Sequence, residues 1–255
     1  MIKAIESFDN SFENFCENDA LGIRAFALFK AYKTDKPYAH FWYQTDELGD
    51  VCAFIAKTDS TVTVSADRVR SDIGEIADFC ALIKYDYLNV HPSVAEEFDG
   101  AVTFTGNVMK RRHDAPFLIS DPDADIRLNT LYDKLYFILQ HNNSSAINQA
   151  DYELWENDIT MRTESGTCRS AVLLDRDIAV SCAMILAETS HAALIGSVAT
   201  EPQFRLLGHA KAVIAKLISL VPGKDIYVIC KDDKVPFYAN LGFTPSGRTC
   251  EVTDR

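Results

Sequence analysis

Residues 198–210 read Val198-Ala199-Thr200-Glu201-Pro202-Gln203-Phe204-Arg205-Leu206-Leu207-Gly208-His209-Ala210. An apolar run ends here, Pro202 introduces a turn, and the pattern Arg205-x-x-Gly208-x-Ala210 opens a helix. The first turn of a helix leaves N–H groups unpaired and carries about half a positive charge, which suits a pyrophosphate. Gly208 lets an anion approach the backbone, and Arg205 adds a charged donor. The pattern therefore predicts an anion site, although alone it also fits a helix start that needs small residues for packing.

Two further segments follow residues 198–210 in the sequence. A strand-like run, Ile226-Tyr227-Val228-Ile229-Cys230, is followed by Phe237-Tyr238-Ala239-Asn240-Leu241-Gly242-Phe243. Together with residues 198–210 they resemble the GCN5-related N-acetyltransferase (GNAT) superfamily. In that family a strand ending in V-A-T-x-P, an R-x-x-G-x-A loop and helix, a strand and Y-x-x-x-G-F occur in this order. The specific match covers residues 191–245.

The resemblance implies an α/β fold with a mixed, mostly antiparallel central sheet and flanking helices. Residues 113–255 would form an acyl-CoA-binding GNAT domain. Residues 1–112 show a weaker version of the same order of elements, which predicts a degenerate GNAT-like N-terminal domain and two similar domains in tandem. The loop after the strand-like run Thr61–Val64 has no glycine before the next helix, so we expect no second cofactor there.

Periodicity and turn signals give the expected elements of the second domain. They are a strand at 117–119, helices at 126–140 and 148–162, strands at 168–174, 178–186 and 192–200, a helix at 208–220, a strand at 226–230, a short helix at 235–241 and a strand at 249–252. A basic cluster, Lys110-Arg111-Arg112-His113, lies at the domain boundary. We interpret its cations as solvated or paired.

The resemblance also implies which residues bind acetyl-CoA. The strand ending at Thr200 would splay from the strand at 226–230 and offer free backbone groups to the pantetheine arm. Backbone N–H groups from Arg205 to Ala210 would bind the pyrophosphate, and Lys211 would either reach a phosphate or remain solvated. The predicted cofactor-binding residues are Val198, Ala199, Thr200, Arg205, Leu206, Leu207, Gly208, His209, Ala210 and Lys211.

Tyr238 matches the position of the family's usual general acid. A thiol with a pKa of about 8.5 favours its protonated form at pH 7 by about 2 kcal/mol, so an acid near the sulfur helps it leave. In the alternative interpretation, Tyr238 is a half-buried tyrosine that packs the short helix. The predicted reaction is transfer of an acetyl group from acetyl-CoA to the amine of a small molecule or peptide by direct attack.

A general base is harder to assign. An amine with a pKa of about 10.4 costs about 4.6 kcal/mol to deprotonate at pH 7. Glu188 and His191 precede the strand at 192–200, and Glu153 and Asp158 lie on the second helix. Each is also explained as a surface charge, and GNAT enzymes can work without a dedicated base.

The chain departs from the usual pattern at two points. Leu206-Leu207 stands where most relatives have basic or small residues, and Lys231 stands where an Asn is common. The leucines remove a charge from the phosphate site. A non-catalytic acyl-CoA-binding or regulatory GNAT-like protein is therefore one alternative function, and a transferase of the same fold that uses a longer acyl chain or another nucleophile is a second.

Composition limits the partners. The net charge of −12 repels nucleic acid and anionic membranes, and it suits a cationic small molecule, although solubility alone also explains an acidic surface. The seven Cys form no CxxC pair or zinc-type cluster, so we expect no metal, and their odd, scattered placement fits a reduced compartment. With no signal peptide or membrane-spanning run, we expect a cytoplasmic monomer or homodimer whose partners are acetyl-CoA and an unidentified amine.

Overall fold

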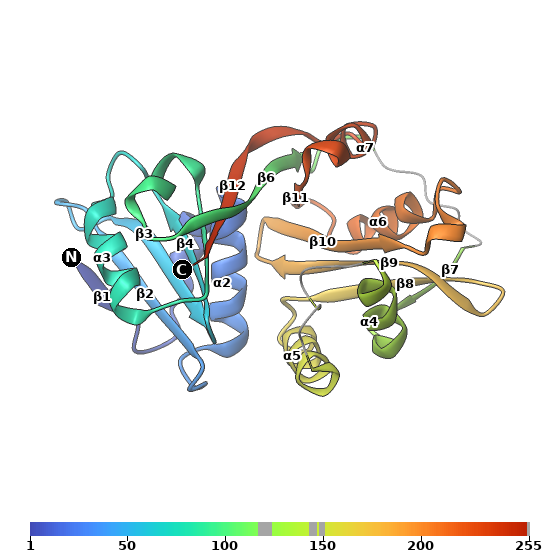
Figure 1. The fold of residues 1–255 in the computed structure, drawn as a ribbon, viewed down its shortest axis with the longest axis horizontal. Helices are drawn as coiled ribbons and strands as arrows, with labels where there is room; N and C mark the ends of the chain where they lie inside the picture. Colours follow the sequence, from blue (N-terminus) through green and yellow to red (C-terminus); the bar gives the residue numbers. More distant parts are fainter. Residues whose placement is uncertain (117–123, 143–146, 148–150, 254–255) are drawn as a thin grey trace. The chain divides into compact units, whose positions relative to one another are not determined.

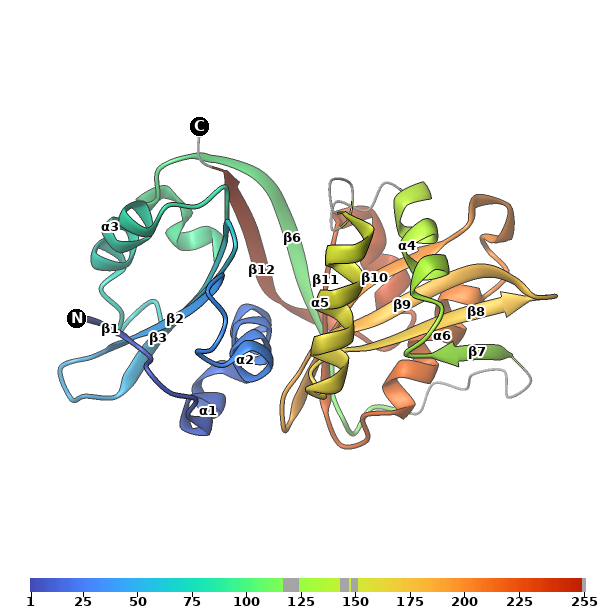
Figure 2. The same cartoon turned by 90° about the horizontal axis from the view of Figure 1, so that it is seen from below.

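The computed structural model describes residues 1–116, 124–142, 147 and 151–253. The chain divides into two compact units (Figures 1 and 2). Unit 1 comprises residues 1–110, 229–236 and 244–255, and unit 2 comprises residues 111–228 and 237–243.

Unit 1 is built on a mostly antiparallel sheet. Its elements are β1 (Ile2–Ala4), α1 (Glu13–Cys16), α2 (Ala20–Tyr32), β2 (Ala39–Thr45), β3 (Val51–Thr58), β4 (Thr61–Ala66), α3 (Ile73–Ile83), β5 (Tyr87–Val90), the 3-10 helix η2 (Pro92–Glu97), β6 (Ala101–Arg111) and β12 (Thr244–Thr253). The strand order is β1-β2-β3-β4-β5-β12-β6, and only β4 and β5 are parallel.

Helices α2 and α3 cover opposite faces of this sheet (Figure 1). Side chains of a strand alternate between the two faces. Val62 and Val64 of β4 therefore share a core cluster with Ile76 of α3. Ser65, the next residue along β4, points to the other face toward Gly22 of α2, where a Cβ added at Gly22 would meet Ser65 Oγ at 2.9 Å. The alternating apolar run thus fixes a three-layer arrangement.

Unit 2 has the same kind of sheet. Its elements are β7 (Asp125–Leu128), α4 (Tyr132–His141), α5 (Tyr152–Glu164), β8 (Arg169–Asp175), β9 (Ile178–Glu188), β10 (Ala192–Thr200), the 3-10 helix η3 (Pro202–Phe204), α6 (His209–Ser219) and most of β11 (Asp225–Cys230) and α7 (Val235–Ala239). The strand order is β7-β8-β9-β10-β11, and only β10 and β11 are parallel.

Helices α4 and α5 lie on one face of the unit 2 sheet and α6 on the other (Figure 2). Leu135 of α4 and Ile159 of α5 share a core cluster with Cys182 and Met184 of β9. Val213 of α6 is also fully buried. This packing fixes the place where β10 passes into α6.

The predicted fold class is confirmed, but one predicted helix starts in the wrong place. Residues 126–128, expected to be helical, belong to β7 and pair with β8, with Ile126 opposite Leu173. Asn129 and Leu131 then adopt left-handed conformations with φ of 51° and 55°, which no helix can include, so α4 begins only at Tyr132. The strand expected at 117–119 and the start of the helix expected at 148 lie outside the described residues.

The C-terminal strand β12 clusters with unit 1. It pairs with β5, where Cys250 lies opposite Val90, and with β6, where Thr249 lies opposite Gly106. Strand β12, Thr244–Thr253, thus completes the sheet of the N-terminal unit. The division into domains 1–112 and 113–255 stays a prediction.

Three general features limit the chemistry. No helix among the described residues combines the length and apolarity needed to span a bilayer. All seven cysteines are free and buried, and burial raises the pKa of the Cys80 thiol to about 12. The described part of the chain holds no group of three or more His, Cys, Asp or Glu side chains arranged to bind a metal.

Candidate functional site

The burial of β10 and its pairing with β11 change halfway along the strand. Its first half, Ala192–Ile195, is buried and pairs in parallel with Asp225–Val228 of β11. Its second half, Gly196–Thr200, is partly exposed, and the pairing with β11 is not continued there. The two parallel strands therefore part within unit 2.

A β-bulge lies where the strands part. Gly196 is opposite Met184 and Ala199 is opposite Cys182, so β10 holds one extra residue here. Ser197 within the bulge has a φ of 50°. A Cβ at position 196 would collide with Leu186 of β9, which explains the glycine.

A hydrogen bond to β9 shows which way the backbone points at the end of β10. Glu201 N–H donates to Val180 O of β9 at 2.9 Å. Because successive backbone groups of a strand point to opposite sides, the backbone of Thr200 faces away from β9, whereas Val198 lies within the bulge, where this alternation is interrupted. Val198 and Thr200 are the two residues that the sequence resemblance implies for the pantetheine arm.

The turn after β10 presents a row of backbone N–H groups. Gly208, with a φ of 87°, is the N-cap of α6 and supplies no side-chain cap. The N–H groups of Leu206, Leu207 and Gly208 have no backbone acceptor among the described residues. The first turn of α6 adds further unpaired donors, as helix geometry requires. Leu206 and Leu207 are exposed, so the donors are reachable.

Arg205 makes its contacts within the turn and with α4. Its Nε donates to Thr200 O at 3.1 Å, and its Nη2 donates to Asn142 Oδ1 at 2.6 Å. Its backbone N–H donates to Pro202 O at 3.3 Å. The guanidinium thus already has two acceptors, whereas Lys211 is exposed on the first turn of α6.

Tyr238 lies on the short helix α7 and is buried. Its ring packs edge-to-face against Phe243, with centroids 5.6 Å apart, and against Phe237 at 5.1 Å. Its carbonyl accepts from the N–H groups of Leu241 at 2.9 Å and of Phe243 at 3.1 Å, and Gly242 turns the chain with a φ of 82°. The Y-x-x-x-G-F motif is thus a closed turn that fixes the tyrosine.

A buried arginine anchors that turn. Arg111, the last residue of β6, donates from Nε to Leu241 O at 3.1 Å and also donates to Pro116 O. Burial lowers the pKa of its guanidinium. Nothing in the basic cluster of the sequence distinguishes Arg111 from Arg112, which pairs with Asp114 at the surface. Sequence reasoning therefore missed this contact.

No protein-family model and no curated protein matches the sequence. Solved structures do match. A GCN5-related N-acetyltransferase from Kribbella flavida is 12% identical, with a TM-score of 0.56 over 79% of this chain and 86% of that one. A tandem GNAT protein from the clavulanic acid biosynthesis pathway is 12% identical, with a TM-score of 0.57 over 98% of this chain and 97% of that one. An acetyltransferase of the GNAT family from Colwellia psychrerythraea is 11% identical, with a TM-score of 0.52 over the whole of both chains.

The chain has the GNAT fold. Because the tandem GNAT protein matches nearly the full length, the fold is that of two GNAT-like units in tandem. The bulged β10, the turn into α6 and the closed turn at Tyr238 are the elements of unit 2 that carry the sequence motifs.

Within the GNAT fold, the candidate base Glu188 already has partners. Glu188 is buried. Its carboxylate lies 2.7 Å from Arg169 Nε and 2.9 Å from Lys224 Nζ. Burial alone would raise its pKa, but hydrogen bonds from Arg169 and Lys224 outweigh that and lower it. Glu188 lies opposite Ala193, about 13 Å of strand away from the bulge at Ser197. We interpret it as a structural ion-pair residue.

Replacing Glu188 by Gln is expected to lower the free energy of unfolding at pH 7 by roughly 2 kcal/mol, because two partly buried cations lose their acceptor. A carboxyl whose pKa is lowered by folding stabilises the protein above its unfolded pKa of about 4.5, and this contribution disappears as pH falls through the folded value. Urea unfolding from pH 7 down to about pH 3 should therefore show a shallower acid loss in the variant. Glu153→Gln, at an exposed site, is the control; equal acid loss in wild type and Glu188→Gln would contradict the assignment.

The other base candidates also have ordinary surroundings. Asp158 pairs with Arg162 one helical turn away at 3.1 Å. His191 and Glu153 are exposed. The described residues therefore single out no base.

Unit 1 repeats the parted strands of the GNAT fold. Residues Thr61–Thr63 of β4 pair in parallel with Tyr87–Asn89 of β5, and the pairing is not continued over Val64–Ala66. The topology of the parted strands is thus present in both units.

The turn that follows in unit 1 differs from its counterpart in unit 2, because carboxylates of the chain occupy its N–H groups. Asp67 Oδ1 accepts from Val69 N at 3.0 Å and from Arg70 N at 3.4 Å. Asp72 Oδ1 accepts from Glu75 N at 2.9 Å at the start of α3. A carboxylate thus accepts the bonds that a phosphate would need.

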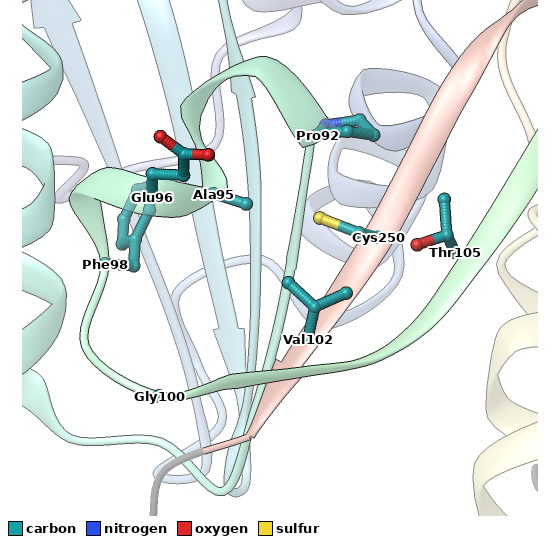
Figure 3. Close-up of a pocket in the computed structure, with 8 residues that line it drawn as sticks. All are labelled: Pro92, Ala95, Glu96, Phe98, Gly100, Val102, Thr105 and Cys250. Atoms are coloured by element: carbon teal, nitrogen blue, oxygen red, sulfur yellow. The ribbon is translucent and has the colours of Figure 1, made fainter.

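Unit 1 also contains a cavity of about 410 Å³ between η2 and the strands β6 and β12 (Figure 3). Ala95 of η2 and Cys250 of β12 point toward it from opposite sides, and Phe98 and Val102 add apolar surface. None of the residues predicted to bind the cofactor lines it.

Proposed function

We propose that the chain is an acetyltransferase in which unit 2 binds acetyl-CoA and passes the acetyl group to an amine. The observation that carries the proposal is the combination, in one unit, of a parted strand with outward backbone groups and a turn with unpaired N–H groups. The GNAT fold of the full chain supports the same function.

The chain's own groups fit the two parts of CoA. The pantetheine arm carries amides, which can pair with the backbone of Val198 and with the N–H of Thr200 as an added strand does, while Thr200 O accepts from Arg205 Nε. The N–H groups from Leu206 to Lys211 suit the pyrophosphate. Because Leu206 and Leu207 bring no charge and Arg205 is engaged elsewhere, we expect affinity to depend on backbone donors.

The reaction is direct transfer. The amine nitrogen attacks the thioester carbonyl carbon, a C–N bond forms, and the C–S bond breaks. The acceptor first gives one proton to water, so that the neutral amine attacks. Tyr238 donates its phenolic proton to the departing sulfur, and the proton that the nitrogen loses after the C–N bond forms returns through water to the Tyr238 phenolate. A thiol with a pKa of about 8.5 favours its protonated form by about 2 kcal/mol at pH 7, so an acid beside the sulfur helps it leave.

The acceptor class follows from charge. A net charge of −12 attracts cations, so the acceptor is an amine that is protonated in solution, on a small molecule or a peptide. The acidic surface raises its local concentration.

The second candidate function is binding of acyl-CoA without turnover. Two observations favour it: the exposed Leu206-Leu207 pair, and the engagement of Glu188 and Asp158 in ion pairs. A regulatory protein needs the donors of the turn but no base.

One assay separates the two functions. Purified protein is mixed with acetyl-CoA and a panel of amines, including polyamines, lysine-containing peptides and aromatic amines, and thiol release is followed over time. Release that depends on one amine supports the transferase. Binding of CoA by calorimetry without release for any amine supports the second function, and absence of CoA binding contradicts both.

A further inference from the structure

The turn between β10 and α6 is fastened to the C-terminal end of α4. On one side Arg205 joins Thr200 O to Asn142 Oδ1, at 3.1 and 2.6 Å. On the other side Glu201 Oε2 lies 3.6 Å from His141 Nδ1. Two consecutive residues of α4 thus hold two residues of the turn, and we call these four residues the α4 clamp.

The α4 end of the clamp is itself fixed. Asn142 caps α4: its Nδ2 donates to Ile138 O at 2.9 Å, and its backbone N–H donates to the same carbonyl at 3.1 Å. Ile138 is fully buried in the core of unit 2. The amide oxygen of Asn142, which accepts from Arg205 Nη2, is therefore held by the C-terminal end of α4.

Two buried polar atoms lie at or beside the turn end of the clamp. Glu201 is buried, and its Oε1 has no hydrogen-bond partner in the described part of the chain. His209 Nε2, on the first residue of α6, is likewise buried without a described partner. A buried polar atom without a partner is costly, so these two atoms are candidates for contacts with a bound ligand or water.

We infer that Arg205 is a positioning residue, whose side chain acts through the α4 clamp and not as a ligand of the phosphates. The inference rests on the proposed binding of acyl-CoA by unit 2. The clamp holds Thr200, whose backbone faces the parted edge, in register with the N–H groups that begin at Leu206. It thereby sets the pantetheine and pyrophosphate contacts in one geometry before the cofactor arrives, which lowers the ordering cost of binding.

A double-mutant cycle tests the clamp. Arg205→Met removes both donors and keeps most of the side chain, and Asn142→Leu removes the acceptor. Each single change is expected to raise the dissociation constant for CoA about tenfold, the effect of releasing one or two ordered residues. Because both changes break the bond between Arg205 and Asn142, the loss in the double variant should stay closer to tenfold than to a hundredfold. Calorimetry measures the constants, and Arg176→Met, an exposed arginine in the β8–β9 turn, is the matched control.

Steady-state kinetics distinguishes positioning from general damage. The clamp predicts that Arg205→Met raises KM for acetyl-CoA about tenfold while kcat changes less than about twofold. Losses that multiply in the double variant, or an unchanged dissociation constant in Arg205→Met, would overturn the inference.

A third measurement separates the clamp from the proposed function. If the wild type does not bind CoA, the proposed function fails, and the clamp is judged on the ligand-free protein by amide hydrogen exchange over residues 201–208. Faster exchange in Arg205→Met at an unchanged melting temperature supports the clamp, and equal exchange contradicts it.

Discussion

Tyr238→Phe is expected to lower kcat by roughly a hundredfold to a thousandfold, the usual contribution of a positioned general acid. The change removes only the hydroxyl. The ring would still pack against Phe243 and Phe237, and the closed turn depends on the backbone of residue 238, so the fold of α7 is preserved. Initial rates of thiol release at saturating acetyl-CoA measure the effect.

The dissociation constant for CoA should change less than about twofold in this variant, because an interaction made mainly in the transition state affects kcat and not binding. Tyr132→Phe is the matched control, since it removes a hydroxyl from a partly buried tyrosine of the same unit, at the start of α4. A Tyr238→Phe variant with wild-type kcat would show that another group, or water, protonates the sulfur.

The sequence was most informative where a pattern is local. Strand β10 was predicted at 192–200 and α6 at 208–220, and the structure has them at 192–200 and 209–219. Apolar runs with β-branched residues predict strands, and the glycine at position 208 predicts the turn where the helix begins.

The sequence failed where the structure depends on distant partners. The apolar spacing of Ile126–Leu128 is compatible with a helix, but these residues pair with β8 and belong to the sheet. Arg111 binds a carbonyl 130 residues away, and Arg205 binds an amide 63 residues away. Glu188 resembled a free carboxylate because Arg169 and Lys224 come from separate strands and turns. No local pattern encodes such contacts.

The two units together show why the site could be predicted in only one of them. Both retain the parallel strands that part, because that feature follows from topology. They differ in the turn: unit 2 has glycine at its N-cap and open donors, whereas unit 1 has aspartates that accept those bonds. The residues at the helix start and in the turn before it therefore decide whether the turn can receive an external anion.

Gly208→Val is accordingly expected to raise the dissociation constant for CoA at least about a hundredfold, equivalent to about 2.8 kcal/mol. A Cβ at position 208 meets no protein atom within 4 Å, so the new side chain would project into open space at the start of α6. There it would cover the N–H groups that the phosphates need. Calorimetric titration with CoA measures the loss.

The backbone at this position adds a second, separable effect. A φ of 87° is strained for a β-branched residue, so Gly208→Val should also lower the free energy of unfolding by about 1–3 kcal/mol. Gly223→Val, before β11, is the matched control, because Gly223 has a φ of 78° and equally open surroundings. It should show the same destabilisation in urea and keep wild-type affinity for CoA. Equal affinity losses in both variants would mean that strain, and not occlusion of the turn, abolishes binding, and that the anion site lies elsewhere in unit 2.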